Sequence, residues 1–163
     1  MTQSRDRTQD NDFFQFEADF VESLRCIPMQ VRLKLDTCGV KLKLDHWHRF
    51  SAGERERLTQ LPCNDGVSAA AYTDYVQSLV QRLQGAPAST LSVEPHPSWH
   101  NSETIPAEVQ TQAETLGTGL SLEQWRSLRP LQRFALLKLS RSSHENRNFY
   151  PALKEFGLIP SQK

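Results

Sequence analysis

The stretch IPMQVRLKLDTCGVKLKLDHW, residues 27–47, decides the fold because it fits two incompatible structures. Apolar and basic residues alternate over 31–44 on either side of the turn-like DTCG, a pattern that is typical of a β-hairpin. The same stretch also fits a helix that begins at Pro28, carries apolar side chains on one face and ends at Gly39. The two interpretations predict different fold classes.

A second copy of this stretch helps to separate the two interpretations. Residues 27–61 align without a gap on residues 105–139, and eleven of the 35 aligned positions are identical. The identical positions are Ile27, Pro28, Val31, Thr37, Gly39, Leu42, Leu44, Trp47, Arg55, Leu58 and Leu61, each matched 78 residues later. In the second copy Pro106 begins and Gly117 ends a run of good helix formers without strand alternation. Residues 28–38 are therefore expected to be helical, with the hairpin as the alternative.

The aligned copies predict an all-α protein of two sequence-similar helical units, about 27–84 and 105–157, packed as one domain. In each unit the first helix ends at a left-handed glycine, which is followed by an extended Leu-x-Leu. A short helix then carries Trp47 or Trp125. Positions that are identical in both copies are adequately explained by packing and turns. The structural candidates are Pro28, Gly39, Trp47, Pro106, Gly117 and Trp125.

Start signals mark the remaining helices of each unit. Ser51 followed by Glu54 predicts a capping box, and Pro130 suits the first helical position at the matching boundary. A fourth helix is expected at about 67–84 in the first unit and at about 145–156 in the second.

Three segments lie outside the two predicted units. Residues 1–12 are polar and are expected to form a disordered tail, while apolar residues over 15–25 predict an amphipathic leading helix. Proline and serine are frequent at about 85–104, which predicts an irregular connector. The expected organisation is a single helical domain over 13–163.

The overall composition is that of an ordinary globular protein. Charged residues make up 23% of the chain and the formal net charge is zero, which argues against general binding of polyanions. Apolar runs are too short to span a bilayer and the polar start lacks a signal-peptide core, so a cytoplasmic location is expected. Three cysteines without a C-x-x-C pair fit free thiols in a reducing compartment.

Three motifs in the first half of the chain form a specific signature. They are F-x-F-E-x-D-F-V-x-S-L-R-C-I-P, V-R-x-K-L-D-x-C-G-x-K-L-x-L-x-x-W and the E-R-x-x-L that follows. This signature resembles the nitrate reductase-associated protein family, found chiefly in cyanobacteria, and the resemblance extends through the second copy. It implies an accessory role in nitrate assimilation, because the family's genes tend to lie near those for nitrate reductase and molybdopterin synthesis. The family has no established catalytic residues to carry over.

The chain contains none of the common catalytic or nucleotide-binding motifs, so we predict neither an enzyme nor a cofactor or metal site. His46 and His48 point in different directions on a helix and are expected to face solvent. Cys26, Cys38 and Cys63 are expected to be small buried hydrophobic residues, with thiolate ligands or redox sensors as the alternative.

Partner binding is predicted at positions where the two copies differ in chemistry. Three basic residues of the first copy, Arg32, Lys34 and Lys41, have uncharged counterparts in the second. The charged ends of Arg32 and Lys34 are expected to reach solvent, where a partner of complementary charge could bind them. Trp99 has no counterpart, and either anchors a partner or pins the connector to the body.

Charge is distributed unevenly along the second half. Residues 83–125 contain no lysine or arginine, whereas 126–147 contain six basic residues and one acidic residue. Neutralisation of the acidic segment by the basic one is expected, and a two-signed surface for a protein partner is the alternative.

The leading functional hypothesis is a non-enzymatic accessory protein that is required for the activity or maturation of assimilatory nitrate reductase. It would act by protein–protein interaction with the enzyme or with its molybdenum-cofactor maturation machinery. One alternative is a helical regulatory module that binds nucleic acid through Arg129, Arg133 and Arg141, although the neutral net charge counts against it. A thiol or metal carrier is the other alternative.

Overall fold

The chain is mostly helical in a computed structural model that describes residues 13–18, 26–141 and 146–159. These ranges contain eight α-helices and one small sheet of two strands, which confirms the predicted all-α class. No helix within them combines the length and the apolar character needed to cross a membrane. The predicted tail, residues 1–12, lies outside the described residues.

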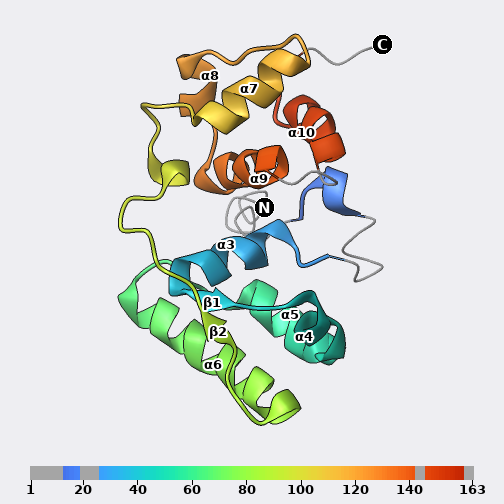
Figure 1. Ribbon diagram of the computed structural model, residues 1–163, viewed down its shortest axis with the longest axis vertical. Helices are drawn as coiled ribbons and strands as arrows, with labels where there is room; N and C mark the ends of the chain where they lie inside the picture. The colour runs from blue at the N-terminus through green and yellow to red at the C-terminus, as the bar shows by residue number, and fades with distance from the viewer. Residues whose placement is uncertain (1–12, 19–25, 142–145, 160–163) are drawn as a thin grey trace, which may run out of the picture. The chain divides into compact units, whose positions relative to one another are not determined.

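The chain divides into two compact units (Figure 1). Unit 1 consists of Met1–Phe13 and Glu17–Glu94, and unit 2 of Phe14–Phe16 and Pro95–Lys163. The elements of unit 1 are α3 (Met29–Cys38), β1 (Val40–Lys41), α4 (Leu44–Arg49), α5 (Ala52–Gln60), α6 (Gly66–Gln84) and β2 (Ser89–Thr90). Those of unit 2 are η3 (Ser98–His100), α7 (Ala107–Thr115), α8 (Leu122–Arg126), α9 (Pro130–Arg141), η4 (Asn146–Asn148) and α10 (Phe149–Glu155). The short η2 (Gln15–Glu17) falls at the boundary between the units along the chain.

Residues Met29–Cys38 form the helix α3, so the hairpin interpretation of residues 27–47 is wrong. Pro28 precedes the helix in an extended conformation, and Gly39 ends it at φ +82°, in the left-handed region that favours glycine. Val31 and Leu35 lie one turn apart and are 0% and 4% exposed. Their burial against α6 requires a helical spacing, which outweighs the alternating pattern.

A two-stranded sheet follows α3 and was not predicted from the sequence. Strand β1 pairs antiparallel with β2, with Val40 opposite Thr90. The carbonyl oxygen of Gly39 extends this pairing by accepting a hydrogen bond of 2.8 Å from the backbone N–H of Leu91. Strand β1 directly precedes the predicted extended Leu-x-Leu of residues 42–44, whose last leucine begins α4, and part of the predicted irregular connector is the partner of β1.

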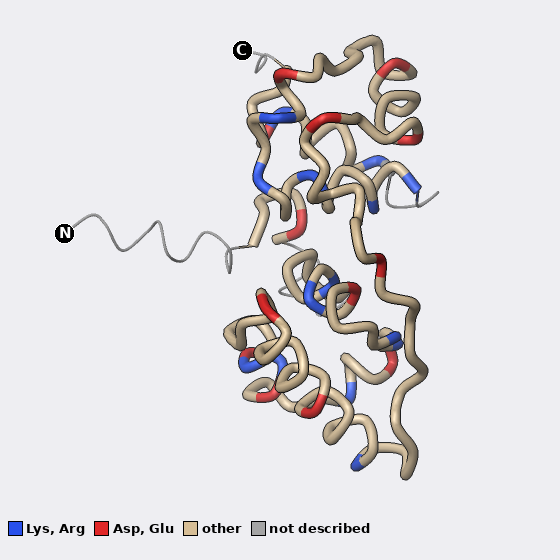
Figure 2. The backbone as a smooth tube through the Cα atoms, turned by 90° about the vertical axis from the view of Figure 1, so that its left-hand side faces the viewer, with Lys and Arg blue, Asp and Glu red and all other residues tan. Residues whose placement is uncertain are grey.

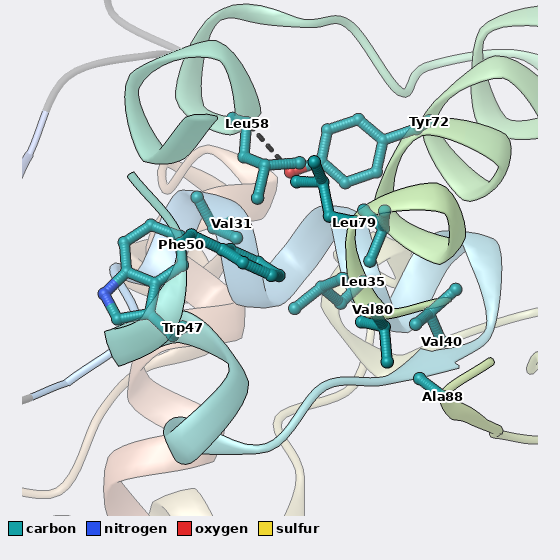
Figure 3. Close-up of a cluster of buried hydrophobic side chains, with 11 residues drawn as sticks. Val31, Leu35, Val40, Trp47, Phe50, Leu58, Tyr72, Leu79, Val80 and Ala88 are labelled. Carbon is teal, nitrogen blue, oxygen red and sulfur yellow. Dashed lines mark hydrogen bonds between the residues drawn. The ribbon is translucent and has the colours of Figure 1, made fainter. Parts of the chain in front are cut away.

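The core of unit 1 is built from α3, α4, α5, α6 and β1 (Figure 3). Its buried side chains are Val31, Leu35, Val40, Trp47, Phe50, Leu58, Tyr72, Val76, Leu79, Val80 and Ala88. Tyr72 lies within this apolar cluster and donates its hydroxyl hydrogen to the carbonyl oxygen of Leu58 at 2.7 Å. The hydrogen bond satisfies the polar end of a side chain that is otherwise buried among hydrocarbon.

Helix α9 is the centre of unit 2 because it contacts η3, α7, η4 and α10. Its side chains are buried on most of its circumference. The buried positions are Leu131, Arg133, Phe134, Ala135, Leu136, Leu137 and Leu139. A helix at the surface would bury only one stripe, so this pattern is typical of a helix surrounded by other elements.

The remaining predicted helices are mostly found within a residue or two of their expected bounds. The capping box at the start of α5 is present, since the Ser51 hydroxyl accepts from the Glu54 N–H and the Glu54 carboxylate accepts from the Ser51 N–H. The fourth helix of unit 2 is shorter than predicted, with η4 in place of its first turn. Most of the predicted leading helix, 15–25, lies outside the described residues, and its described start is η2.

Candidate functional site

The three basic residues predicted to bind a partner lie on or directly after α3. Lys41 is exposed on β1 and Arg32 is half-buried on α3. The ammonium group of Lys34 donates hydrogen bonds to the carbonyl oxygens of Thr59 at 2.9 Å and Leu61 at 2.6 Å. These oxygens lie at the C-terminal end of α5, where helical carbonyls lack intrahelical donors and attract a cation. The expectation that the Lys34 charge extends into solvent is therefore wrong, because it caps this helix.

Trp99, the fourth partner-binding candidate, is 8% exposed in η3. Its ring makes an edge-to-face contact with Phe134, with 5.0 Å between the ring centroids. Its carbonyl oxygen accepts a hydrogen bond of 2.8 Å from the Arg133 side chain. Both contacts fasten this part of the connector to α9, as the pinning interpretation expects. A role for Trp99 in partner binding stays a prediction.

In unit 1, Arg55 stabilises the turn that follows the short helix α4. Its guanidinium donates to the carbonyl oxygen of Trp47 at 3.2 Å and to that of Phe50. These oxygens lie at the C-terminal end of the six-residue helix α4, where the Trp47 oxygen also accepts from the backbone N–H of Phe50 at 3.2 Å. In the sequence Arg55 is marked only by its identity with Arg133, and this role was not predicted.

In unit 2, Arg133 makes the equivalent contacts from the matched position, 78 residues later. It donates to the carbonyl oxygen of Trp125 at 3.2 Å and to that of Leu128 at 2.7 Å, in addition to the Trp99 carbonyl. Arg133 is only 7% exposed, and its desolvation lowers the pKa of the guanidinium from its ordinary value. The shared contacts are compatible with a duplication, which itself stays a prediction.

His46 is buried, at 3% exposed, so the expectation that it faces solvent is wrong; His48 is exposed as expected. The backbone N–H of Lys43 donates to Nδ1 of His46 at 3.2 Å. The proton of the neutral ring is therefore on Nε2, which donates to the Gln84 side chain at 3.1 Å. Gln124 at the matched position likewise accepts from the N–H of its N-cap residue. The capping role of His46 could have been predicted from the sequence, because His46 aligns with Gln124 of the second capping box.

The structure brings Cys38 and Cys63 together in unit 1. Cys38 is the last residue of α3 and Cys63 follows α5, and both are half-buried at the edge of the core. A hydrogen bond with the Cys63 thiol is the main cause that lowers the pKa of Cys38 to about 7. The same contact raises the pKa of Cys63. Cys26 lies before α3 and is half-buried.

The acidic and basic segments of the second half pair with each other within unit 2. Arg126 forms an ion pair with Glu103 at 2.6 Å, and Arg141 forms one with Glu108 at 3.0 Å. These contacts support the predicted neutralisation. They also involve Arg141 of the proposed nucleic-acid surface, whose second member, Arg133, is buried. Figure 2 shows that basic and acidic positions are distributed over both units.

In the described ranges no group of three or more His, Cys, Asp and Glu side chains is placed to hold a metal ion. The fold and the candidate site define a mostly helical protein in which Lys34, Arg55 and Arg133 bind backbone carbonyl groups at helix ends. The chain belongs to the conserved nitrate reductase-associated protein family, whose model matches residues 13–156. This match confirms the resemblance inferred from the sequence motifs. Neither a curated protein nor a solved structure matches the chain.

Proposed function

We propose that this protein is a non-enzymatic accessory protein that makes assimilatory nitrate reductase active. It acts in the cytoplasm by binding the enzyme or its molybdenum-cofactor maturation machinery. The observation that carries the proposal is membership of a family described as nitrate reductase-associated, over most of the chain. The family description supports an association with nitrate reductase.

The chemistry of the described side chains supports a binding role rather than catalysis. Three polar groups that could serve an active site are used in the fold instead. Arg133 and Lys34 bind backbone carbonyl groups, and His46 joins a helix start to α6. An active site normally leaves such groups directed at a pocket rather than at the backbone.

Arg32 and Lys41 of unit 1 are the best candidates for the binding surface. Their matched residues in unit 2, Gln110 and Gly119, are uncharged, whereas the third such basic residue, Lys34, caps α5. Lys41 is exposed, next to the sheet, and Arg32 is half-buried on the preceding helix. Basic groups of this kind attract an acidic surface on a partner and raise the rate of encounter.

The double variant Arg32→Glu, Lys41→Glu tests this proposal in a strain that lacks the protein. Lys34 is left unchanged, since its replacement would also remove the cap of α5. We expect the variant to fold, to lose capture of nitrate reductase or of a cofactor-maturation protein from a nitrate-grown lysate, and to lower nitrate reductase activity at least about tenfold. Growth on nitrate is the second measurement, with growth on ammonium as its reference.

The matched control is Arg147→Glu, Lys154→Glu, which alters two exposed basic residues of unit 2 and changes the net charge equally. It should restore activity like the unmodified protein. Full restoration by both double variants would remove Arg32 and Lys41 from the functional surface. Normal nitrate reductase activity in the strain without the protein would contradict the accessory role itself.

A further inference from the structure

Cys38 and Cys63 meet because two helices end at the same place in unit 1. Cys38 ends α3, while Cys63 lies in the short connection between α5 and α6. The Cys63 sulfur is 3.5 Å from the carbonyl oxygen of Lys34, and the Cys38 sulfur is 3.8 Å from that of Leu35. These two carbonyl groups are consecutive in the last turn of α3. Both sulfurs therefore lie against one turn of one helix, and the two thiols are within hydrogen-bonding reach of each other.

The surroundings of the pair favour a single negative charge on it. Lys34 lies beside Cys63, held by its bonds to the end of α5 and 5.7 Å above the Tyr72 ring, and its positive charge favours the Cys63 thiolate. The carboxylate of Asp65 has the opposite effect on Cys63. A thiol that donates to a neighbouring sulfur stabilises the thiolate there, and this holds the pKa of Cys38 at about 7. Part of the Cys38 population is therefore thiolate at neutral pH.

Both cysteines are half-buried rather than enclosed. A small oxidant can reach such a sulfur, whereas a cysteine that served only as a buried hydrophobic residue would be protected from it. The two thiols of Cys38 and Cys63 and the ammonium group of Lys34 thus lie close together at the edge of the core.

We propose that Cys38 and Cys63 form a reversible dithiol–disulfide site that is oxidised by a hydroperoxide. The Cys38 thiolate attacks one peroxide oxygen, so that an S–O bond forms and the O–O bond breaks. The Cys63 sulfur then attacks the sulfenic sulfur, so that an S–S bond forms and hydroxide leaves. The sulfurs lose two electrons, which reduce the peroxide, and the two thiol protons end on its oxygens. A small dithiol reduces the disulfide back to two thiols by thiol–disulfide exchange, and is itself oxidised.

Oxidation would connect the end of α3 covalently to the start of α6. The bond closes a loop between residues 38 and 63 and removes conformations from the unfolded chain. It also removes the thiol hydrogen of Cys63, whose sulfur lies 3.5 Å from the Lys34 carbonyl oxygen. We expect the melting temperature of the oxidised protein to rise by about 5 °C or more. The site is independent of the proposed accessory function, and either can hold without the other.

The test treats the full-length reduced protein with hydrogen peroxide, blocks remaining thiols, and digests it with trypsin without reducing agent. Trypsin separates the three cysteines into peptides 26–32, 35–41 and 58–82. We expect one linked product of peptides 35–41 and 58–82, with the mass of two hydrogen atoms lost, while peptide 26–32 remains blocked. Dithiothreitol should restore both free peptides.

Cys26→Ser is the matched control, and should leave the linkage and the rise in melting temperature unchanged. Cys38→Ser and Cys63→Ser should each abolish both. The proposal is overturned if the unmodified protein remains folded and yields no linked peptide. It is equally overturned if Cys26 is linked as readily as the other two, since the pairing would then reflect general exposure rather than this site.

Discussion

Arg55 of unit 1 and Arg133 of unit 2 make the same kind of hydrogen bond, but Arg133 is the more deeply buried of the two. Each donates to carbonyl oxygens at the end of a short helix that carries a buried tryptophan. Arg55 is half-buried, whereas Arg133 is buried and also binds the carbonyl group of Trp99. The difference shows that the cost of losing such an arginine depends on how far its carbonyl partners are removed from water.

The largest expected effect comes from replacing these two arginines. Arg133→Met removes three hydrogen bonds to buried carbonyl groups, although the Trp125 oxygen still accepts from the Leu128 N–H. The loss should lower the free energy of unfolding by about 3–5 kcal/mol. Arg55→Met should lower it by about 1–2 kcal/mol, because water can reach part of its site. Urea denaturation of both variants measures the difference. Equal losses would show that burial of the arginine does not set its contribution.

The matched glycines sharpen the same comparison. Gly39 and Gly117 both have positive φ, of 82° and 77°. A Cβ atom at Gly39 would lie 3.0 Å from the Leu91 carbonyl oxygen and 2.8 Å from a methyl carbon of Val93, whereas one at Gly117 would have no atom within 4 Å. The closer surroundings of Gly39 result from its position beside β2.

Gly39→Val should therefore cost about 3 kcal/mol of stability, and Gly117→Val about 1–2 kcal/mol. The second variant is strained only by its backbone, while the first must also move Leu91 and Val93 in the segment after β2. Thermal denaturation of the two variants provides the measurement. A loss at Gly117 as large as that at Gly39 would mean that the left-handed conformation alone determines the cost.

The smallest effect is expected at Lys34 and its matched residue Gln112. Lys34→Met removes the two hydrogen bonds that cap α5 and should cost about 1–2 kcal/mol. Gln112→Met should change stability by no more than about 0.5 kcal/mol. Equal, small changes in the denaturation midpoint would show that the capping bonds are too weak to matter and would return Lys34 to the candidate binding surface.

The sequence predicted the features that depend on residues close together in the chain. The glycine terminator of α3 and the capping box at Ser51 follow from local sequence signals. The choice of a helix over a hairpin for α3 also needed the comparison with residues 105–139. The pairing of β1 with β2 joins residues about 50 positions apart, and two-residue strands have no alternation to detect. The meeting of Cys38 with Cys63 likewise depends on how two helices pack, which a single sequence does not specify.

The burial of the tryptophans gives each unit its own fluorescent reporter. Unit 1 contains Trp47 and unit 2 contains Trp99 and Trp125, and these are the three tryptophans of the chain. The indole N–H of Trp125 donates to the Asn101 carbonyl oxygen at 2.9 Å, whereas that of Trp47 has no partner within the described part of the chain. Replacing Trp47 by phenylalanine leaves emission from unit 2 alone. Comparing its unfolding curve with that of a variant retaining only Trp47 would reveal whether the units melt together or in succession.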